Sequence, residues 1–183
     1  RGVIVVGPHA PADRQEFADA LLELSHLTGW PVLADGAGAV RGDLAGSGRL
    51  VSAYDLILRD PKLAQALRPT AAIFVGPLPT SKVLRAWLKD SDVVALQINR
   101  AGENVDSTHG RWTRLDGTLT PSGEHAKATD NVRLSAWSKA QKAARAKLER
   151  IARVDWNFEG RIVTLVEEAL GPDDRLFIGS SMP

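Results

Sequence analysis

Five consecutive apolar residues, 71–75, constrain the fold of this chain more than any other stretch. The run Ala-Ala-Ile-Phe-Val has no polar alternation, which is typical of a parallel strand covered on both faces. Gly76 and two prolines follow and end the strand. Thr80 or Ser81 can then cap a helix, and residues 83–88 place four apolar side chains along one side of it. We therefore predict a strand, a tight turn and a helix.

Strand and helix patterns alternate along the rest of the chain. Strand-like apolar runs lie at residues 2–7, 30–35, 93–98 and 175–179. Amphipathic helical patterns lie at residues 12–27, 159–169 and a long stretch from 123 or 130 to 153, with two short helices expected within 50–67. Gly29 ends the first of these helices. This alternation predicts an α/β fold, with a parallel sheet that carries helices on both faces.

Composition excludes several classes of protein. The chain has 183 residues, enough for one domain with a real core, and a net charge of +1, which gives no reason to expect nucleic acid as a partner. It has no cysteine, so thiol catalysis and thiolate metal sites are excluded. No apolar run approaches the roughly 20 residues of a membrane-spanning helix. We expect a cytoplasmic protein without membrane insertion, and, since strands stand at both ends, a segment of a longer protein.

A glycine-rich stretch, residues 36–48, follows the second predicted strand. A dinucleotide-binding fingerprint would need a third glycine where Arg41 stands, and no helix follows directly. We therefore predict a flexible loop at the carboxyl edge of the sheet. Ligands of open α/β sheets bind beyond that edge, so Arg41 and Asp43 are candidates to face a site.

Lys82 is the strongest candidate for binding chemistry. It falls in the first turn of a predicted helix, where free N–H groups already make the helix end positive. The preceding turn is not a phosphate loop, because Ser81 stands in the place of a glycine and Pro77 and Pro79 lack N–H donors. A smaller anion, such as a carboxylate, could be held by Lys82 together with the helix start.

Other kinds of site have little support. The four histidines show no metal-ligand spacing, and no nucleophile elbow is present. The basic face of residues 130–153 lacks stacking aromatics, so we interpret it as a solvated helix face and not as a nucleic-acid surface. From its residues alone, the chain is an α/β domain with one anion site, no metal site and no complete catalytic set.

Five motifs occur in order along nearly the whole chain. They are Trp-Pro-Val-Leu-Ala-Asp at 30–35, Tyr-Asp-Leu-Ile-Leu-Arg at 54–59, Arg68-Pro69, Gly-Pro-Leu-Pro-Thr-Ser-Lys at 76–82 with Trp87-Leu88, and Phe-Ile-Gly-Ser-Ser-Met-Pro at 177–183. Together they resemble the SEPHCHC synthase family (2-succinyl-5-enolpyruvyl-6-hydroxy-3-cyclohexene-1-carboxylate synthase), thiamine-diphosphate transferases of menaquinone and phylloquinone biosynthesis. The resemblance implies the Rossmann-like central domain of thiamine-diphosphate enzymes, with about six mainly parallel strands. Residues 1–175 would form that domain, and 176–183 would begin a truncated carboxy-terminal cofactor-binding domain.

The resemblance also implies an activity. Enzymes of this family decarboxylate 2-oxoglutarate and add the resulting succinyl-semialdehyde carbanion to isochorismate, using thiamine diphosphate and Mg²⁺. Lys82 matches an active-site lysine of the family, and Ser181 matches a serine that contacts the isochorismate-derived part. Ser180 stands where the family usually has asparagine, and Arg41 is retained as a further candidate.

The family's catalytic and cofactor-binding residues belong to domains outside these 183 residues. The resemblance therefore implies no catalytic residue and no metal site in this fragment, which should bind no thiamine diphosphate and be inactive alone. The full-length enzyme is expected to be a homodimer or homotetramer. Two departures, at Gly38 and Val83, remove a serine and a second cation that relatives carry. Two alternatives remain open: the central domain of an acetolactate-synthase-like enzyme, where this fold can hold FAD, and a stand-alone small-acid-binding module.

Overall fold

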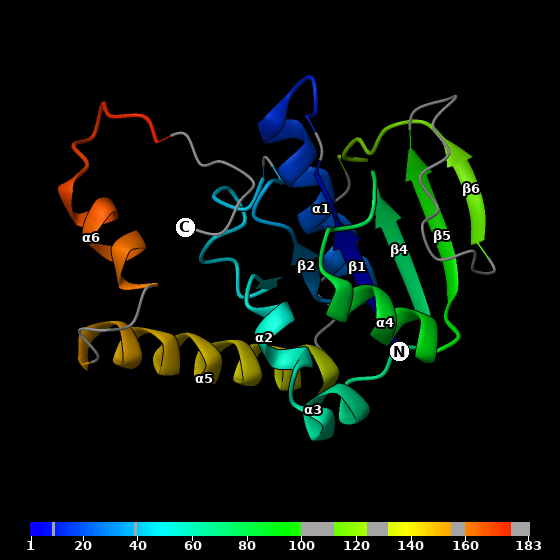
Figure 1. Ribbon diagram of the computed structural model, residues 1–183. Helices are drawn as coiled ribbons and strands as arrows, with labels where there is room; N and C mark the ends of the chain where they lie inside the picture. The colour runs from blue at the N-terminus through cyan, green and yellow to red at the C-terminus, as the bar shows by residue number, and fades with distance from the viewer. Residues whose placement is uncertain (9, 39, 100–111, 124–131, 155–159, 177–183) are drawn as a thin grey trace. The chain divides into compact units, whose positions relative to one another are not determined.

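The structure is a computed structural model of the chain, and it describes residues 1–8, 10–38, 40–99, 112–123, 132–154 and 160–176. The chain forms two compact units, Arg1–Lys142 and Ala143–Pro183. Each unit is described by itself. All strands of the described residues belong to the first unit (Figure 1).

A six-stranded sheet forms the centre of the first unit. Its strands, in chain order, are β1 (Gly2–Val6), β2 (Val32–Ala34), β3 (Leu50–Val51), β4 (Ala71–Val75), β5 (Val94–Asn99) and β6 (Trp112–Asp116). They lie in the order β3-β2-β1-β4-β5-β6, and every pairing is parallel. All five residues of β1 are buried, as the absence of polar alternation predicts for a central parallel strand. The predicted α/β fold with about six parallel strands is confirmed.

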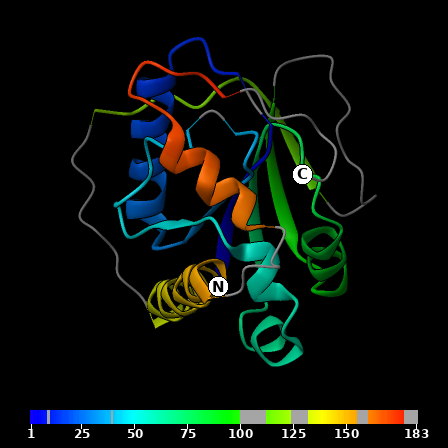
Figure 2. The same ribbon diagram turned by 60° about the vertical axis from the view of Figure 1, so that its left-hand side comes forward.

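Two helices cover opposite faces of this sheet. Helix α1 (Arg14–Thr28) joins β1 to β2, and helix α4 (Lys82–Asp90) joins β4 to β5. The two connections move in opposite directions along the sheet, so right-handed crossovers place their helices on opposite faces. Figure 2 shows α1 and α4 on the two sides of the strands.

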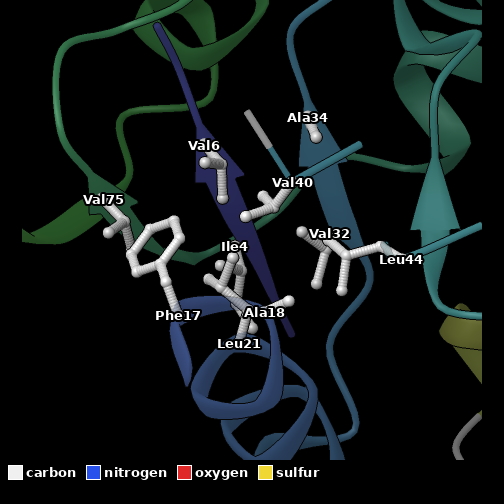
Figure 3. Close-up of a cluster of buried hydrophobic side chains, with 10 residues drawn as sticks. All are labelled: Ile4, Val6, Phe17, Ala18, Leu21, Val32, Ala34, Val40, Leu44 and Val75. Atoms are coloured by element: carbon white, nitrogen blue, oxygen red, sulfur yellow. The ribbon is translucent and has the colours of Figure 1, made fainter. Parts of the chain in front are cut away.

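Helix α1 covers one face with a compact apolar cluster. Phe17, Ala18 and Leu21 contact the side chains of β1 (Figure 3). The helix begins at an Asp13 cap whose carboxylate accepts from the Glu16 N–H at 2.9 Å. It ends at Gly29, whose φ of 67° is the left-handed conformation that glycine adopts most readily. The predicted end of this helix is confirmed.

The opposite side of the first unit carries α4 and three further helices. These are α2 (Tyr54–Leu58), α3 (Pro61–Ala66) and α5 (Val132–Val154), of which residues 132–142 belong to this unit. The Trp137 side chain of α5 is 1% exposed and stands edge-on to Trp87 of α4, with ring centroids 5.8 Å apart. Gln141 of α5 bonds the chain just before α2, accepting from Ala53 N–H at 2.9 Å.

Two local predictions differ from the structure. Strand β3 lies in a stretch for which only two short helices are predicted, because two residues are too few to show a period. Within the glycine-rich stretch, residues 36–37 and 40–46 form turns, and the Val40 and Leu44 side chains are fully buried in the apolar cluster between α1 and the sheet (Figure 3). This loop is anchored in the core, unlike the flexible loop that its glycine content predicts.

The second unit contains the rest of α5 and helix α6 (Arg161–Ala169). Several apolar side chains of α6 are about half exposed, among them Ile162 and Val163. The strand predicted at 175–179 falls, apart from its first two residues, outside the part of the chain that the structure describes. None of the described helices combines the length and hydropathy needed to cross a bilayer.

Candidate functional site

The strand order reverses between β1 and β4, and this reversal marks the usual ligand position in an open α/β sheet. Beyond the carboxyl ends of these two strands stand Gly7 and the turn formed by residues 76–81. A Cβ atom on Gly7 would lie 1.8 Å from the carbonyl oxygen of Pro77, so the two backbones are in direct contact. The two chain segments that leave the sheet at this reversal are therefore packed directly against each other.

The turn after β4 leads to the start of α4, where Lys82 is the first helical residue. Ser81 is the N-cap: its hydroxyl oxygen accepts from the Leu84 N–H at 3.1 Å. The same hydroxyl donates to Asp55 Oδ1 at 2.5 Å. The Lys82 side chain is exposed, and no described carboxylate lies within ion-pair distance of it. The prediction that Lys82 occupies the first turn of a helix capped by Thr80 or Ser81 is confirmed, with Ser81 as the cap.

Asp35, directly after β2, holds Thr80, the residue of this turn that precedes Ser81. Its Oδ2 accepts from the Thr80 N–H at 3.3 Å, and its Oδ1 accepts from the Ala37 N–H at 2.9 Å. Asp35 also lies close enough to Tyr54 for its charge to act on the phenol. Burial, and then the negative charges of Asp35 and Asp55, raise the pKa of Tyr54 well above its ordinary range. Tyr54 therefore remains a neutral hydrogen-bond donor at physiological pH.

Asp55 connects α2 to the start of α4. Its Oδ2 is paired with Arg59 Nε at 2.9 Å, one helical turn further on, while its Oδ1 accepts from Ser81. Partial burial raises the pKa of Asp55, but the hydrogen bonds from Ser81 and Arg59 outweigh it and hold the pKa below its ordinary value. Asp55 is therefore an anion whose two oxygens are both engaged. We call Asp35, Tyr54, Asp55, Thr80 and Ser81 the carboxyl-edge network.

Arg41 lies beside this network. Its Nη2 donates to the Ser52 carbonyl oxygen at 3.1 Å, and its charge acts on Tyr54. The structure thus brings two of the predicted site residues, Arg41 and Lys82, to the same edge of the sheet. Asp43, the other candidate of the glycine-rich loop, is paired with Arg14 Nε at 3.2 Å. The remaining two substrate-binding candidates, Ser180 and Ser181, fall beyond the described residues. Whether these four bind substrate stays a prediction.

The network members Asp35, Tyr54 and Asp55 were not identified as site residues by sequence reasoning. The sequence did contain a sign of these residues, because three of the five motifs meet at this edge of the sheet. The motif 30–35 ends in Asp35, the motif 54–59 supplies Tyr54 and Asp55, and the motif 76–82 supplies the turn and Lys82. Segments that are distant in sequence converge on the start of α4.

A hollow of about 610 Å³ lies within the second unit, between the end of α5 and α6. Its lining includes Arg145 and Arg153 but also Glu149, Glu167 and Glu168. Charges of both signs line the same open space, so they do not create the field of one sign that concentrates a charged ligand. The carboxyl-edge network is therefore the better candidate site.

Comparisons with known proteins agree on one family. The family model described as the middle domain of thiamine pyrophosphate matches residues 1–178. Proteins named 2-succinyl-5-enolpyruvyl-6-hydroxy-3-cyclohexene-1-carboxylate synthase match all of this chain. Those of Acaryochloris marina, Nostoc sp. and Thermosynechococcus vestitus are 34%, 35% and 35% identical over 192, 188 and 187 residues. The matched region is 33%, 32% and 32% of these relatives, so the chain spans about a third of their length.

Proposed function

Because the chain belongs to the family of thiamine pyrophosphate middle domains, we propose that it is the central domain of a larger thiamine-diphosphate-dependent transferase of menaquinone biosynthesis. The full-length enzyme would decarboxylate 2-oxoglutarate and add the remaining four-carbon unit to isochorismate. The names of the relatives, matched along the whole chain at 34–35% identity, support this assignment over an acetolactate-synthase-like enzyme and over a stand-alone module.

The role proposed for this domain is to hold a substrate carboxylate at Lys82. One observation carries the proposal: Lys82 is an exposed cation at the positive end of α4, and both carboxylates of the network are already bonded to the turn. We propose that a ligand supplies the anion that this positive helix end favours. Both proposed substrates carry carboxylates, which accept strong hydrogen bonds from an ammonium group.

Three further residues are proposed as substrate contacts. The Ser52 carbonyl holds one guanidinium nitrogen of Arg41, so that this cation is oriented at the same edge as Lys82. Ser180 and Ser181 would contribute hydroxyl groups from the motif that we propose as the start of the carboxy-terminal domain, residues 176–183. The proposal includes a cytoplasmic enzyme that assembles as a homodimer or homotetramer.

The described residues do not fit the cofactor itself. Thiamine diphosphate needs N–H donors and a divalent cation at its diphosphate. The turn after β4 contains Pro77 and Pro79, which have no N–H, and no cluster of three metal-ligating side chains occurs in the described part of the chain. We therefore propose that other domains of the full-length enzyme hold thiamine diphosphate and Mg²⁺. Calorimetry of the isolated chain with both should show no binding, and micromolar binding would overturn this part of the proposal.

Steady-state kinetics of the full-length enzyme test the role of Lys82. Loss of a charge-assisted hydrogen bond of about 1.5–3 kcal/mol should raise the KM of one substrate about 10- to 100-fold in Lys82→Ala. Lys89→Ala is the matched control, because Lys89 is an exposed lysine in the last turn of the same helix. Its kinetics should equal those of the wild type. If Lys82→Ala retained the wild-type KM and kcat, Lys82 would be a solvated surface residue with no role in substrate binding.

A further inference from the structure

We infer that Asp55 is a positioning residue, which fixes the start of α4 through Ser81 and so directs Lys82 toward the substrate. The inference rests on the proposed role of Lys82 and extends it to a residue that does not touch the substrate. Its basis is a chain of three bonded groups: Arg59, Asp55 and the Ser81 hydroxyl. These groups join α2 to the residue immediately before Lys82.

The Ser81 hydroxyl has a single hydrogen, and its direction determines what the oxygen can accept. That hydrogen is donated to Asp55 Oδ1 at 2.5 Å, which leaves a lone pair for the Leu84 N–H at 3.1 Å. The acceptor thus holds the hydroxyl in the rotamer in which it caps α4. Without Asp55, the cap remains possible but nothing fixes it.

Asp55 is itself held in place from two sides. Arg59 occupies its Oδ2 at 2.9 Å, so the carboxylate cannot turn both oxygens toward Lys82. The chain just before α2 is fixed by Gln141, which accepts from Ala53 N–H at 2.9 Å and donates to Ser52 Oγ at 2.7 Å. The position of α2 is therefore set by helix α5, and Asp55 transmits that position to the turn.

A second carboxylate acts on the neighbouring residue. Asp35 Oδ2 accepts from the Thr80 N–H at 3.3 Å, and the charge of Asp35 also acts on Tyr54, the residue before Asp55. Two consecutive residues of the turn, Thr80 and Ser81, are thus bonded to carboxylates from other elements. Lys82 is the next residue after this bonded pair, so its backbone has little freedom to move.

Charge and position predict opposite results for the neutral variants. If Asp55 acted by its charge, Asp55→Asn and Asp55→Ala would change carboxylate binding equally, and both would strengthen it. If Asp55 acts by position, Asp55→Asn retains an oxygen that accepts from Ser81, whereas Asp55→Ala does not. Rescue by asparagine therefore separates the two explanations.

The test is the substrate KM of the full-length enzyme. Asp55→Ala and Ser81→Ala should each raise the KM that depends on Lys82 by about tenfold or more, since misplacement of a binding group by about 1 Å is that costly. Asp55→Asn and Ser81→Thr should stay within about threefold of the wild type. In a Lys82→Ala background, Asp55→Ala should have no further effect on KM.

Asp60→Ala is the matched control. Asp60 caps α3 through the Lys62 and Leu63 N–H groups at 2.8 and 3.2 Å, without a bond to the start of α4. It should lower the melting temperature and leave KM unchanged. Equal effects of Asp55→Ala and Asp55→Asn, or an undiminished effect of Asp55→Ala in the Lys82→Ala background, would refute the inference. A wild-type KM in Lys82→Ala alone would instead refute the proposed function.

Discussion

Replacement of Gly7 by alanine tests whether the backbone contact at the strand reversal sets the position of Lys82. The added Cβ would lie 1.8 Å from the Pro77 carbonyl oxygen, 2.8 Å from the Pro77 carbonyl carbon and 3.0 Å from the Leu78 carbonyl carbon. Real Cβ contacts essentially never fall below 3.0 Å and are ordinary from 3.4 Å, so the nearest atom must move by about 1.2–1.6 Å. That atom belongs to the backbone and cannot rotate away like a side chain.

The displacement should affect both stability and substrate binding. Overpacking of this kind costs about 1–3 kcal/mol, which lowers the melting temperature of a domain of this size by about 2–12 °C. The turn has no loose end to absorb the shift, because β4 precedes it and Asp35 and Asp55 hold Thr80 and Ser81. A shift of about 1 Å at the start of α4 would raise KM by up to about 100-fold.

Gly42→Ala is the matched control for this variant. Gly42 lies in the anchored loop, and a Cβ there would meet no atom within 4 Å. Thermal melting and substrate kinetics of the two full-length variants should therefore diverge, with Gly42→Ala at or slightly above wild-type stability. Wild-type melting and KM in Gly7→Ala would refute the reasoning, since they would show that the turn yields without moving Lys82.

Two further predictions concern the first unit. Trp137→Ala removes a buried indole and should lower the free energy of unfolding by about 3–5 kcal/mol, with part recovered in Trp137→Phe; an unchanged urea midpoint would contradict this. Burial and the charges of Asp35 and Asp55 raise the pKa of Tyr54 in the folded state. The neutral Tyr54 side chain therefore stabilises the fold fully at pH values below 10.0, its pKa in the unfolded chain, and this stabilisation declines as the pH rises above that value. Tyr54→Phe should flatten that alkaline decline, and because Tyr54 is the single tyrosine, a phenolate that titrates near pH 10 in the folded chain would contradict the prediction.

The fold was predictable where strong local signals mark an element and its ends. Strand β4 is an uninterrupted apolar run, and Gly29 and Ser81 mark helix ends with the residues that such ends favour. Strand β3 was not predictable, because its two residues become a strand only by pairing with Val32 and Leu33 of β2. That pairing is a tertiary contact, and no pattern within residues 50–51 encodes it.

The site was predictable only in part, for a related reason. Lys82 stands out locally, as a cation at a helix start. The role of Asp55 depends on Ser81, which is 26 residues away, and that of Asp35 depends on Thr80, which is 45 residues away. Neither aspartate belongs to a local chemical pattern. Their partners are determined by the order of strands in the sheet, which brings the ends of β2, β3 and β4 to one edge.

Two aspartates beside a lysine would ordinarily neutralise it, and the hydrogen bonds explain why this does not happen here. A surface ion pair between Lys82 and either aspartate would contribute only about 0–1 kcal/mol, and a substrate carboxylate would have to displace it. Asp35 and Asp55 instead accept from a backbone N–H and from the capping hydroxyl of the turn. Their charges stabilise the groups that define the helix start, and the ammonium group stays available to an incoming anion. The same two carboxylates that would weaken an anion site by their charge therefore strengthen it by fixing the geometry of its cation.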